Sequence, residues 1–184
     1  MTLSGNNVYT GLTTINSGTL ILSGGSAISD AGSILLAAAS ASLQLSANET
    51  IGSINAAIGG TLNLAAGVLT VGGSASSSFA GNVMGGGALT KSGAGILTLS
   101  GVNTFAGATT VSGGSLVLQG GSALATSNAV TVNAGGTLFL NSSQQIASIA
   151  GAGTINLGAS GNILTLGGSL NTTFSGLVSG GGQI

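Results

Sequence analysis

Only four side chains in this sequence of 184 residues carry an ionisable group, and two of them are carboxylates, Asp30 and Glu49. If the chain returned above itself about every 20 residues, these two would lie on neighbouring turns. Carboxylates about 5–5.5 Å apart can act as the acid and the nucleophile of a retaining glycosidase. The chain contains no histidine and no arginine that would bind a substrate or move a proton. The residue types therefore favour two solvated surface charges and predict that the protein is not an enzyme.

The second half of the chain supports this interpretation. The positions that match Asp30 and Glu49 there hold Thr126 and Gln144, which are uncharged. Metal sites are built mainly from histidine, cysteine and carboxylates, and the chain has no histidine and no cysteine. The sequence therefore predicts no catalytic residue, no metal site and no cofactor.

The remaining charge, Lys91, lies in a glycine-containing segment, residues 85–92 (GGGALTKS). A phosphate-binding loop requires glycine directly before the lysine and a helix after it. Here Thr90 precedes the lysine and strand-like residues follow. The segment is expected to form a corner of the chain, with Lys91 in solvent.

Four aromatic residues fall at matching positions of the two halves: Tyr9 with Phe105, and Phe79 with Phe174. One interpretation is an aromatic binding stripe. The favoured one is stacking inside the core, because the chain has few other large side chains to fill it.

The composition limits the partners that this chain can have. A net charge of −1 that arises from three groups provides no basic surface, so nucleic-acid binding is not expected. An exposed ion pair contributes at most about 1 kcal/mol, whereas burying one Leu, Ile or Val contributes roughly 1.5–3 kcal/mol. Apolar burial and backbone hydrogen bonds must hold this fold together.

The most apolar segment, residues 56–73 (AAIGGTLNLAAGVLTVGG), is uncharged. Its apolar residues alternate with glycine, threonine and asparagine, which argues against a transmembrane helix. Direct insertion of this segment into a membrane is not expected.

The chain is made of two imperfect copies of one unit, residues 1–89 and 90–184. Residues 2–5 (TLSG) match residues 98–101, an offset of 96, and residues 18–22 (GTLIL) match residues 114–118 (GSLVL). Further along the offset becomes 95, as when Phe79-Ala80-Gly81 matches Phe174-Ser175-Gly176. Internal repetition of this kind is typical of solenoids, and a single solenoid over residues 1–184 is expected.

Each copy contains short segments of alternating apolar and polar residues, separated by glycine and serine. Such alternation predicts strands, and strands this short are stable only when many of them stack in register. About three strands per turn, or 20–25 residues, would return the chain above its start. The prediction is an all-β, right-handed parallel β-helix of about eight or nine coils, roughly 40 Å long.

Two features leave room for other folds. Turn signals every 8–12 residues also suit an antiparallel β-sandwich, although the long repeat favours the solenoid. Residues 34–43 (ILLAAASASL) resemble a helix, but their counterpart, residues 130–138 (VTVNAGGTL), does not. Both segments are expected to form strand, turn and strand.

Residues 87–116 (GALTKSGAGILTLSGVNTFAGATTVSGGSL) resemble the autotransporter-associated β-strand repeat, also called the passenger-associated transport repeat. The first copy keeps the later half of this motif, from Thr2 to Leu20. The resemblance implies a stalk segment of a bacterial passenger or adhesin that is secreted or displayed at the outer-membrane surface. It further implies a right-handed β-helix whose stepwise folding assists export, with neighbouring repeats of a longer chain as partners.

Two other functions remain open. Outward threonines, at residues 13–14 and 109–110, could bind ice, mineral or glycan. Solenoid ends without polar caps leave open strand edges, which favour end-to-end self-association.

Overall fold

The computed structural model describes residues 1–169 and 171–184. Within these residues the secondary structure consists of strands and turns, without a helix. All strand pairs are parallel, and the chain forms a β-solenoid of about nine turns. The predicted all-β parallel solenoid is confirmed.

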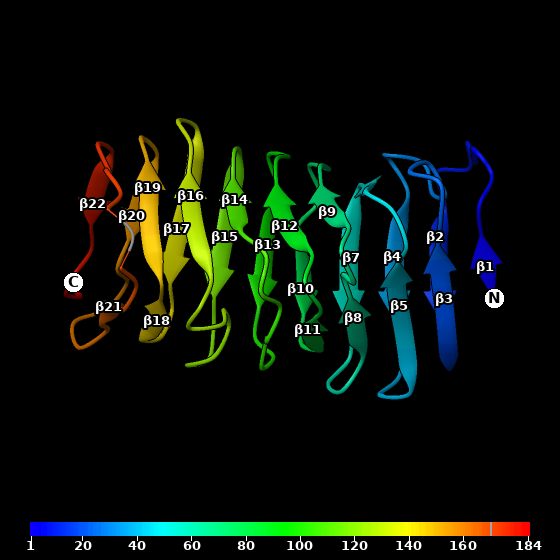
Figure 1. The fold of residues 1–184 in the computed structure, drawn as a ribbon, viewed down its shortest axis with the longest axis horizontal. Coiled ribbons are helices and arrows are strands. Elements are labelled where there is room, and N and C mark those ends of the chain that lie inside the picture. Colours follow the sequence, from blue (N-terminus) through cyan, green and yellow to red (C-terminus); the bar gives the residue numbers. More distant parts are fainter. Residues whose placement is uncertain (170) are drawn as a thin grey trace.

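The strands stack into long sheets that run along the axis of the solenoid (Figure 1). The nine-stranded sheet contains β2 (Leu12–Ile15), β4 (Ser33–Leu36), β7 (Ser53–Ala56), β10 (Ser77–Phe79), β13 (Ile96–Leu99), β15 (Gly114–Leu118), β17 (Gly136–Leu140), β20 (Thr154–Asn156) and β22 (Leu177–Ser179). The six-stranded sheet contains β6 (Glu49–Ile51), β9 (Val68–Val71), β12 (Ala88–Lys91), β14 (Thr109–Val111), β16 (Ala129–Val132) and β19 (Ser148–Gly151).

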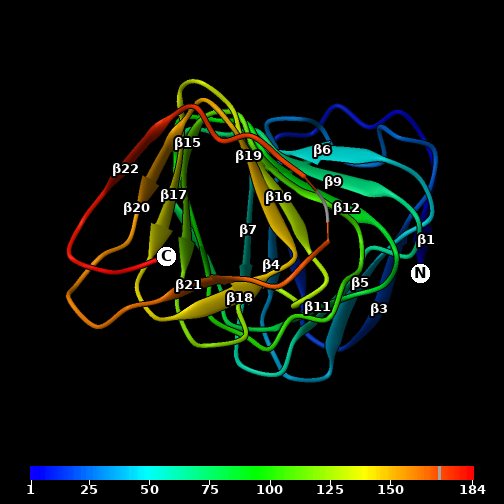
Figure 2. The same cartoon turned by 60° about the vertical axis from the view of Figure 1, so that its left-hand side comes forward.

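Two shorter sheets complete the wall. One contains β1 (Thr2–Leu3), β3 (Gly18–Leu22), β5 (Ala41–Leu45), β8 (Thr61–Asn63) and β11 (Asn82–Met84). The other pairs β18 (Gln144–Ile146) with β21 (Leu164–Leu166). The ribbon coils around one axis, with the two termini at opposite ends (Figures 1 and 2).

The register gives the length of a coil. Thr137 pairs with Thr154, 17 positions later, and Ala56 pairs with Phe79, 23 positions later. Most of the other strand pairs are 20–23 positions apart, within the predicted 20–25 residues, and a few are 19 apart.

The core is a set of parallel rows of aliphatic side chains. One row contains Leu97, Leu116, Leu138 and Ile155, which are register partners on β13, β15, β17 and β20 and are all buried. Each contributes about 1.5–3 kcal/mol by leaving water, so the rows supply most of the stabilisation.

The helix-like segment at residues 34–43 forms the end of β4, a turn and the start of β5. Its counterpart at residues 130–138 spans β16, a turn and most of β17. Both expectations are confirmed, because Ile34 and Leu36 alternate inward with strand period and each strand finds a register partner.

The second copy of the unit is advanced around the axis relative to the first. The segment that forms β3 in the five-stranded sheet forms β15 in the nine-stranded sheet in the second copy. Likewise β2 belongs to the nine-stranded sheet, whereas its counterpart β14 belongs to the six-stranded sheet. A unit therefore spans a fractional number of turns, and equivalent segments lie on successive faces of the solenoid.

Candidate functional site

Glu49 does not lie in solvent, contrary to the prediction. It is buried in the inward row of the six-stranded sheet, where its register partner is Leu69. Its Oε2 accepts a hydrogen bond from the Ala27 N–H at 3.1 Å, and its Oε1 accepts one from the Ile28 N–H at 2.7 Å. The carboxylate therefore holds the loop of the preceding coil, since it provides acceptors for two buried backbone donors.

Asp30 is exposed, as predicted. It lies two residues beyond Ile28, and no hydrogen bond or ion pair to its carboxylate is found among the described residues. Because Glu49 is buried and Asp30 is exposed, the two carboxylates do not face a common site.

The counterpart of Glu49 in the second copy is Gln144, which is also buried. Its amide nitrogen donates to the backbone oxygens of Gly120 and Ser143, the latter at 2.9 Å. Its Oε1 has no partner among the described residues. The same repeat position thus anchors a loop through acceptors in one copy and through donors in the other.

Lys91 is also buried, contrary to the prediction that its side chain lies in solvent. It lies on β12 between Val71 and Val111, in a row that faces the interior. Its Nζ donates a hydrogen bond to the Gly93 carbonyl oxygen. Burial lowers the pKa of the Lys91 ammonium from its ordinary value of 10.5.

A signal for the inward lysine was present in the sequence. Strand residues two positions apart face the same side, and Leu89 of β12 is buried. Lys91 must then also face the interior, whatever its charge. The segment from Gly85 is indeed a turn followed by a strand, as expected.

The aromatic residues follow the favoured interpretation with one exception. Phe79 and Phe105 are fully buried, and Phe174 packs partly against the core. Tyr9 is partly exposed, and its hydroxyl lies 2.9 Å from the Thr13 Oγ1. The exposure of Tyr9 reflects its place on the first coil, where no coil lies above it.

The prediction that Thr109 and Thr110 both face outward is correct only for Thr110. Thr109 faces the core, where it is fully buried and its Oγ1 has no partner among the described residues. Thr110 faces outward and belongs to a ladder that the sequence reading missed. That ladder consists of Thr50, Thr70, Thr90, Thr110 and Thr131, register partners on five consecutive strands of the six-stranded sheet.

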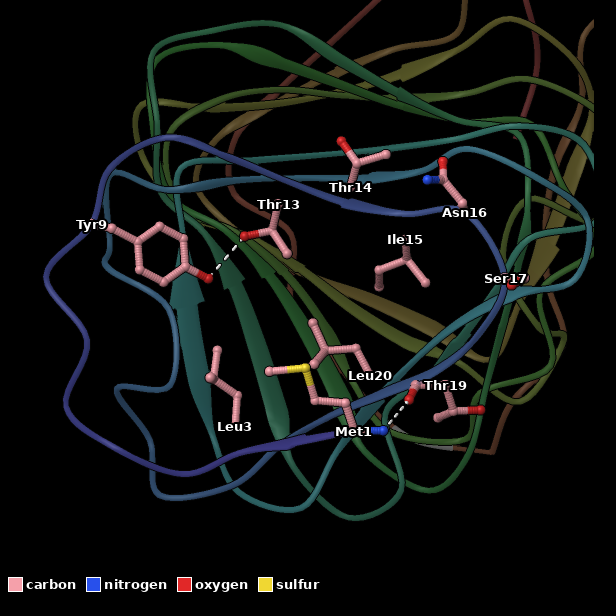
Figure 3. Close-up of a pocket in the computed structure, with 10 residues that line it drawn as sticks. All are labelled: Met1, Leu3, Tyr9, Thr13, Thr14, Ile15, Asn16, Ser17, Thr19 and Leu20. Carbon is pink, nitrogen blue, oxygen red and sulfur yellow. Dashed lines mark hydrogen bonds between the residues drawn. The ribbon is translucent and has the colours of Figure 1, made fainter.

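A pocket of about 450 Å³ opens at the N-terminal end of the solenoid (Figure 3). Met1, Leu3 and Leu20 line one side of it, and Tyr9 and Ile15 lie across from them. The pocket is the uncovered end of the aliphatic rows, because β1 and β2 are the first strands of their sheets.

Asn103 is a buried polar residue that the sequence reading did not single out. Its Oδ1 accepts a hydrogen bond from the Val83 N–H at 2.7 Å, and its amide nitrogen donates to the Ala123 carbonyl oxygen at 2.7 Å. These partners lie on the coils before and after its own, so one side chain joins three coils. The only sequence signal is its match to Asn7 in the first copy.

Other kinds of site find little support in the described part of the chain. No group of three or more potential metal-ligating side chains occurs there. No helix long and apolar enough to cross a membrane is present in those residues.

Comparison with protein families finds two matching segments, residues 1–22 and residues 89–118. Both match the passenger-associated-transport-repeat. The resemblance seen in the sequence is confirmed for these segments. No curated protein and no solved structure matches the chain.

The two matched segments are equivalent parts of the repeat unit, although their strands lie on successive faces of the solenoid. The second repeat contains the buried Lys91, Asn103 and Phe105, and the first contains Asn7 and Tyr9. Each repeat therefore contains an asparagine that hydrogen-bonds to a neighbouring coil and an aromatic residue, which is buried at Phe105 and exposed at Tyr9.

Proposed function

We propose that this chain is a shaft segment of a secreted or surface-displayed bacterial passenger, that its stepwise folding assists export, and that it presents other domains away from the cell. The observation that carries the proposal is the unbroken parallel ladder. Each strand of the nine-stranded sheet pairs only with the coil before it and the coil after it.

Such a solenoid gains stability from contacts between neighbouring coils. Folding can therefore begin as soon as two coils have emerged from a pore, and each further coil adds to the folded part. The chain has no cysteine and no proline, so disulfide exchange and proline isomerisation do not slow this process. The two matched repeats support the surface location, because the family is described as a transport repeat of passengers.

The chain is proposed to have no catalytic role. Glu49 and Lys91 are each occupied by backbone partners inside the solenoid, and Asp30 stands alone on its surface. These placements leave no pair of titrating groups facing a common substrate.

An export assay tests the folding-driven mechanism. The chain is placed between a secretion signal and an outer-membrane translocator in a protease-deficient Gram-negative host, and its surface amount is measured. Replacing the buried Leu97, Leu99 and Leu116 with Asp should lower export several-fold. Each substitution removes apolar packing from the core and places an unpaired charge there, so the coils no longer fold stably.

A matched control uses the outward residues of the same strands. Ile96, Thr98 and Val117 lie on β13 and β15 and are not buried. Replacing these three with Asp should leave export unchanged. Full export of the buried triple variant would remove the folding-driven account.

A second candidate function is surface binding by the threonine ladder. Strands in register lie about 4.8 Å apart, so Thr50, Thr70, Thr90, Thr110 and Thr131 form a regular outward row without charged neighbours in the row. Such a row suits a repetitive target, such as ice or a crystalline glycan. Measurements of thermal hysteresis and of binding to insoluble polysaccharides test it, with Thr90→Lys as the disrupting variant. No hysteresis and no retention by the unmodified protein would exclude this function.

A further inference from the structure

A second pocket, of about 390 Å³, lies where the loops at residues 4–11 and 23–32 of two neighbouring coils meet. It contains Asp30, the exposed carboxylate that the shaft function does not use. The lining consists of five polar residues and two aliphatic ones: Asn6, Asn7, Ser26, Ser29 and Asp30, with Val8 and Ile28.

Hydrogen bonds hold both loops, so the pocket is formed before any ligand arrives. The Asn7 N–H donates to the Ser26 carbonyl oxygen at 3.0 Å, and the Asn7 amide nitrogen donates to the Ala27 carbonyl oxygen at 2.9 Å. From the following coil, Glu49 accepts from the N–H groups of Ala27 and Ile28. Ile28 is therefore fixed at the base of the pocket, and the residues that follow it form the rim.

The same pair of loops recurs in the middle of the chain, at residues 100–108 and 119–128. There the Asn103 N–H donates to the Ser122 carbonyl oxygen at 2.9 Å, and the Asn103 amide nitrogen donates to the Ala123 carbonyl oxygen at 2.7 Å. These are the hydrogen bonds that join the two loops of the first copy. The loop pair is therefore a repeated element of the solenoid.

The middle pair shows that the lining positions are open to solvent when coils lie on both sides. Val102, the counterpart of Asn6, is 62% exposed there. Thr126, the counterpart of Asp30, is also exposed. Access to the pocket thus follows from the position of the loops on the wall, and it holds in a longer array of coils.

The polar groups at the rim are available to a ligand. No hydrogen bond to the side chains of Asn6, Ser26 or Asp30 is found in the described part of the chain, and the Ser29 Oγ accepts one from the Ala31 N–H at 3.4 Å. A carboxylate accepts hydrogen bonds, whereas a carboxamide and a hydroxyl both donate and accept them. This mixture of donors and acceptors suits a ligand that carries several adjacent hydroxyl groups.

We propose that this pocket binds a neutral pyranose unit of a glycan. The Asp30 carboxylate accepts charge-assisted hydrogen bonds from ring hydroxyls, and the Asn6 carboxamide both donates and accepts. Val8, which is 83% exposed, contacts the C–H face of the ring. A pocket of about 390 Å³ is within the size range of small-ligand sites. The single carboxylate disfavours acidic sugars, because like charges repel.

The second copy keeps the scaffold of this site but not its chemistry. Three polar lining residues of the first copy, Asn6, Ser29 and Asp30, are replaced there by Val102, Ala125 and Thr126. The proposal therefore assigns sugar binding to the first loop pair alone, with one sugar per chain.

The test is a titration of the protein with the methyl pyranosides of glucose, galactose, mannose and N-acetylglucosamine, followed by two-dimensional amide NMR. At least one sugar should shift the amides of Asn6, Ser26 and Asp30 in a saturable manner. Asp30→Thr introduces the residue of the second copy and should weaken binding about tenfold, as expected for the loss of a hydrogen bond to a charged group. Gln145→Thr, at an exposed position on β18, should bind like the unmodified chain.

The second copy allows the converse experiment. The triple variant Val102→Asn, Ala125→Ser and Thr126→Asp transfers the differing polar residues to the middle loop pair. The number of sugars bound per chain should then rise from one to two, with new shifts at residues 102 and 126. Because these three residues lie in loops, circular dichroism should show an unchanged strand content.

Three results would overturn the proposal: no saturable shift with any of the four sugars, shifts confined to residues outside the pocket, or Asp30→Thr binding as tightly as the unmodified chain. Shifts at these amides with calcium chloride alone, and none with a sugar, would assign the pocket to a cation and also reject it. Thr90→Lys should leave sugar binding unchanged, which separates this pocket from the threonine ladder. Sugar binding by the isolated chain is independent of export.

Discussion

Glu49 and Lys91 lie two strands apart in the six-stranded sheet, and both side chains face the interior of the solenoid. They do not form an ion pair. Each is held by backbone groups instead, Glu49 by the N–H groups of Ala27 and Ile28 and Lys91 by the carbonyl oxygen of Gly93. These two charged side chains therefore bind backbone groups of loops and turns inside the solenoid, and Asp30 is left as the exposed charged side chain on its surface.

Stability should rise with pH because of Lys91. Burial lowers the pKa of Lys91 in the folded protein below the value of 10.5 that it keeps when unfolded. Between these two values the unfolded chain binds more protons, so the free energy of unfolding increases as pH rises and stops increasing above about 10.5. Urea midpoints measured from pH 7 to pH 10.5 should therefore increase.

The Lys91→Met variant is the control for this prediction. It keeps the length of the side chain but has no titrating group at this position. Its midpoint should change less with pH than that of the unmodified chain. Parallel pH profiles for the two proteins would show that Lys91 is not the source.

Replacing Glu49 with Gln should loosen the loop at residues 23–32. A glutamine presents one acceptor where the carboxylate presents two, so one buried N–H of Ala27 or Ile28 loses its partner. The expected loss in the free energy of unfolding is about 1–3 kcal/mol. Hydrogen exchange at these two amides should accelerate, and the exposed-site control Asp30→Asn should change neither quantity; equal exchange in both variants would contradict the assigned role.

Replacing Thr109 with Val should stabilise the protein. The Thr109 hydroxyl is fully buried, has no partner in the described structure and lies between Leu89 and Val130 in an inward row. Valine has the same shape without the desolvated hydroxyl, so a gain of about 1 kcal/mol is expected. The outward Thr110→Val change should be nearly neutral, and thermal unfolding of the two variants compares them; a loss of stability in Thr109→Val would reveal a hydrogen bond for the hydroxyl.

A methyl group at Gly101 should separate two coils. A Cβ on this residue would overlap the backbone oxygen of Gly81 on the preceding coil. Overpacking of this kind lowers stability by typically about 1–3 kcal/mol. Gly11→Ala is the matched control, because a Cβ there meets no atom within 4 Å. Equal denaturation midpoints for the two alanine variants would contradict the close packing of the coils.

The sequence was sufficient to predict the solenoid because its signals are periodic. Alternation within strands such as Gly136–Leu140 sets which side chains face inward, and the long repeat implies that equivalent strands recur. The helix-like residues 34–43 could also be assigned, because their counterpart in the second copy contains two glycines.

The candidate site was predicted less well, for a physical reason. Charged residues are placed in solvent by default, since burying an unpaired charge is unfavourable. Glu49 and Lys91 are exceptions because backbone groups of adjacent coils or turns pair with them, and those partners come together only when the coils stack. The inward direction of Thr109 could have been predicted from Val111, two residues later on the same strand.

The advance of the second copy around the axis has a consequence for anything grafted onto the rod. The long loops at residues 4–11 and 23–32 and those at residues 100–108 and 119–128 belong to equivalent positions, yet they leave the wall on different faces. In a tandem array of such units, the equivalent loops of successive units would leave the solenoid at successive positions around its axis. An insertion repeated in every unit would therefore project in a different direction from the insertion in the next unit, and the two inserted segments would not collide.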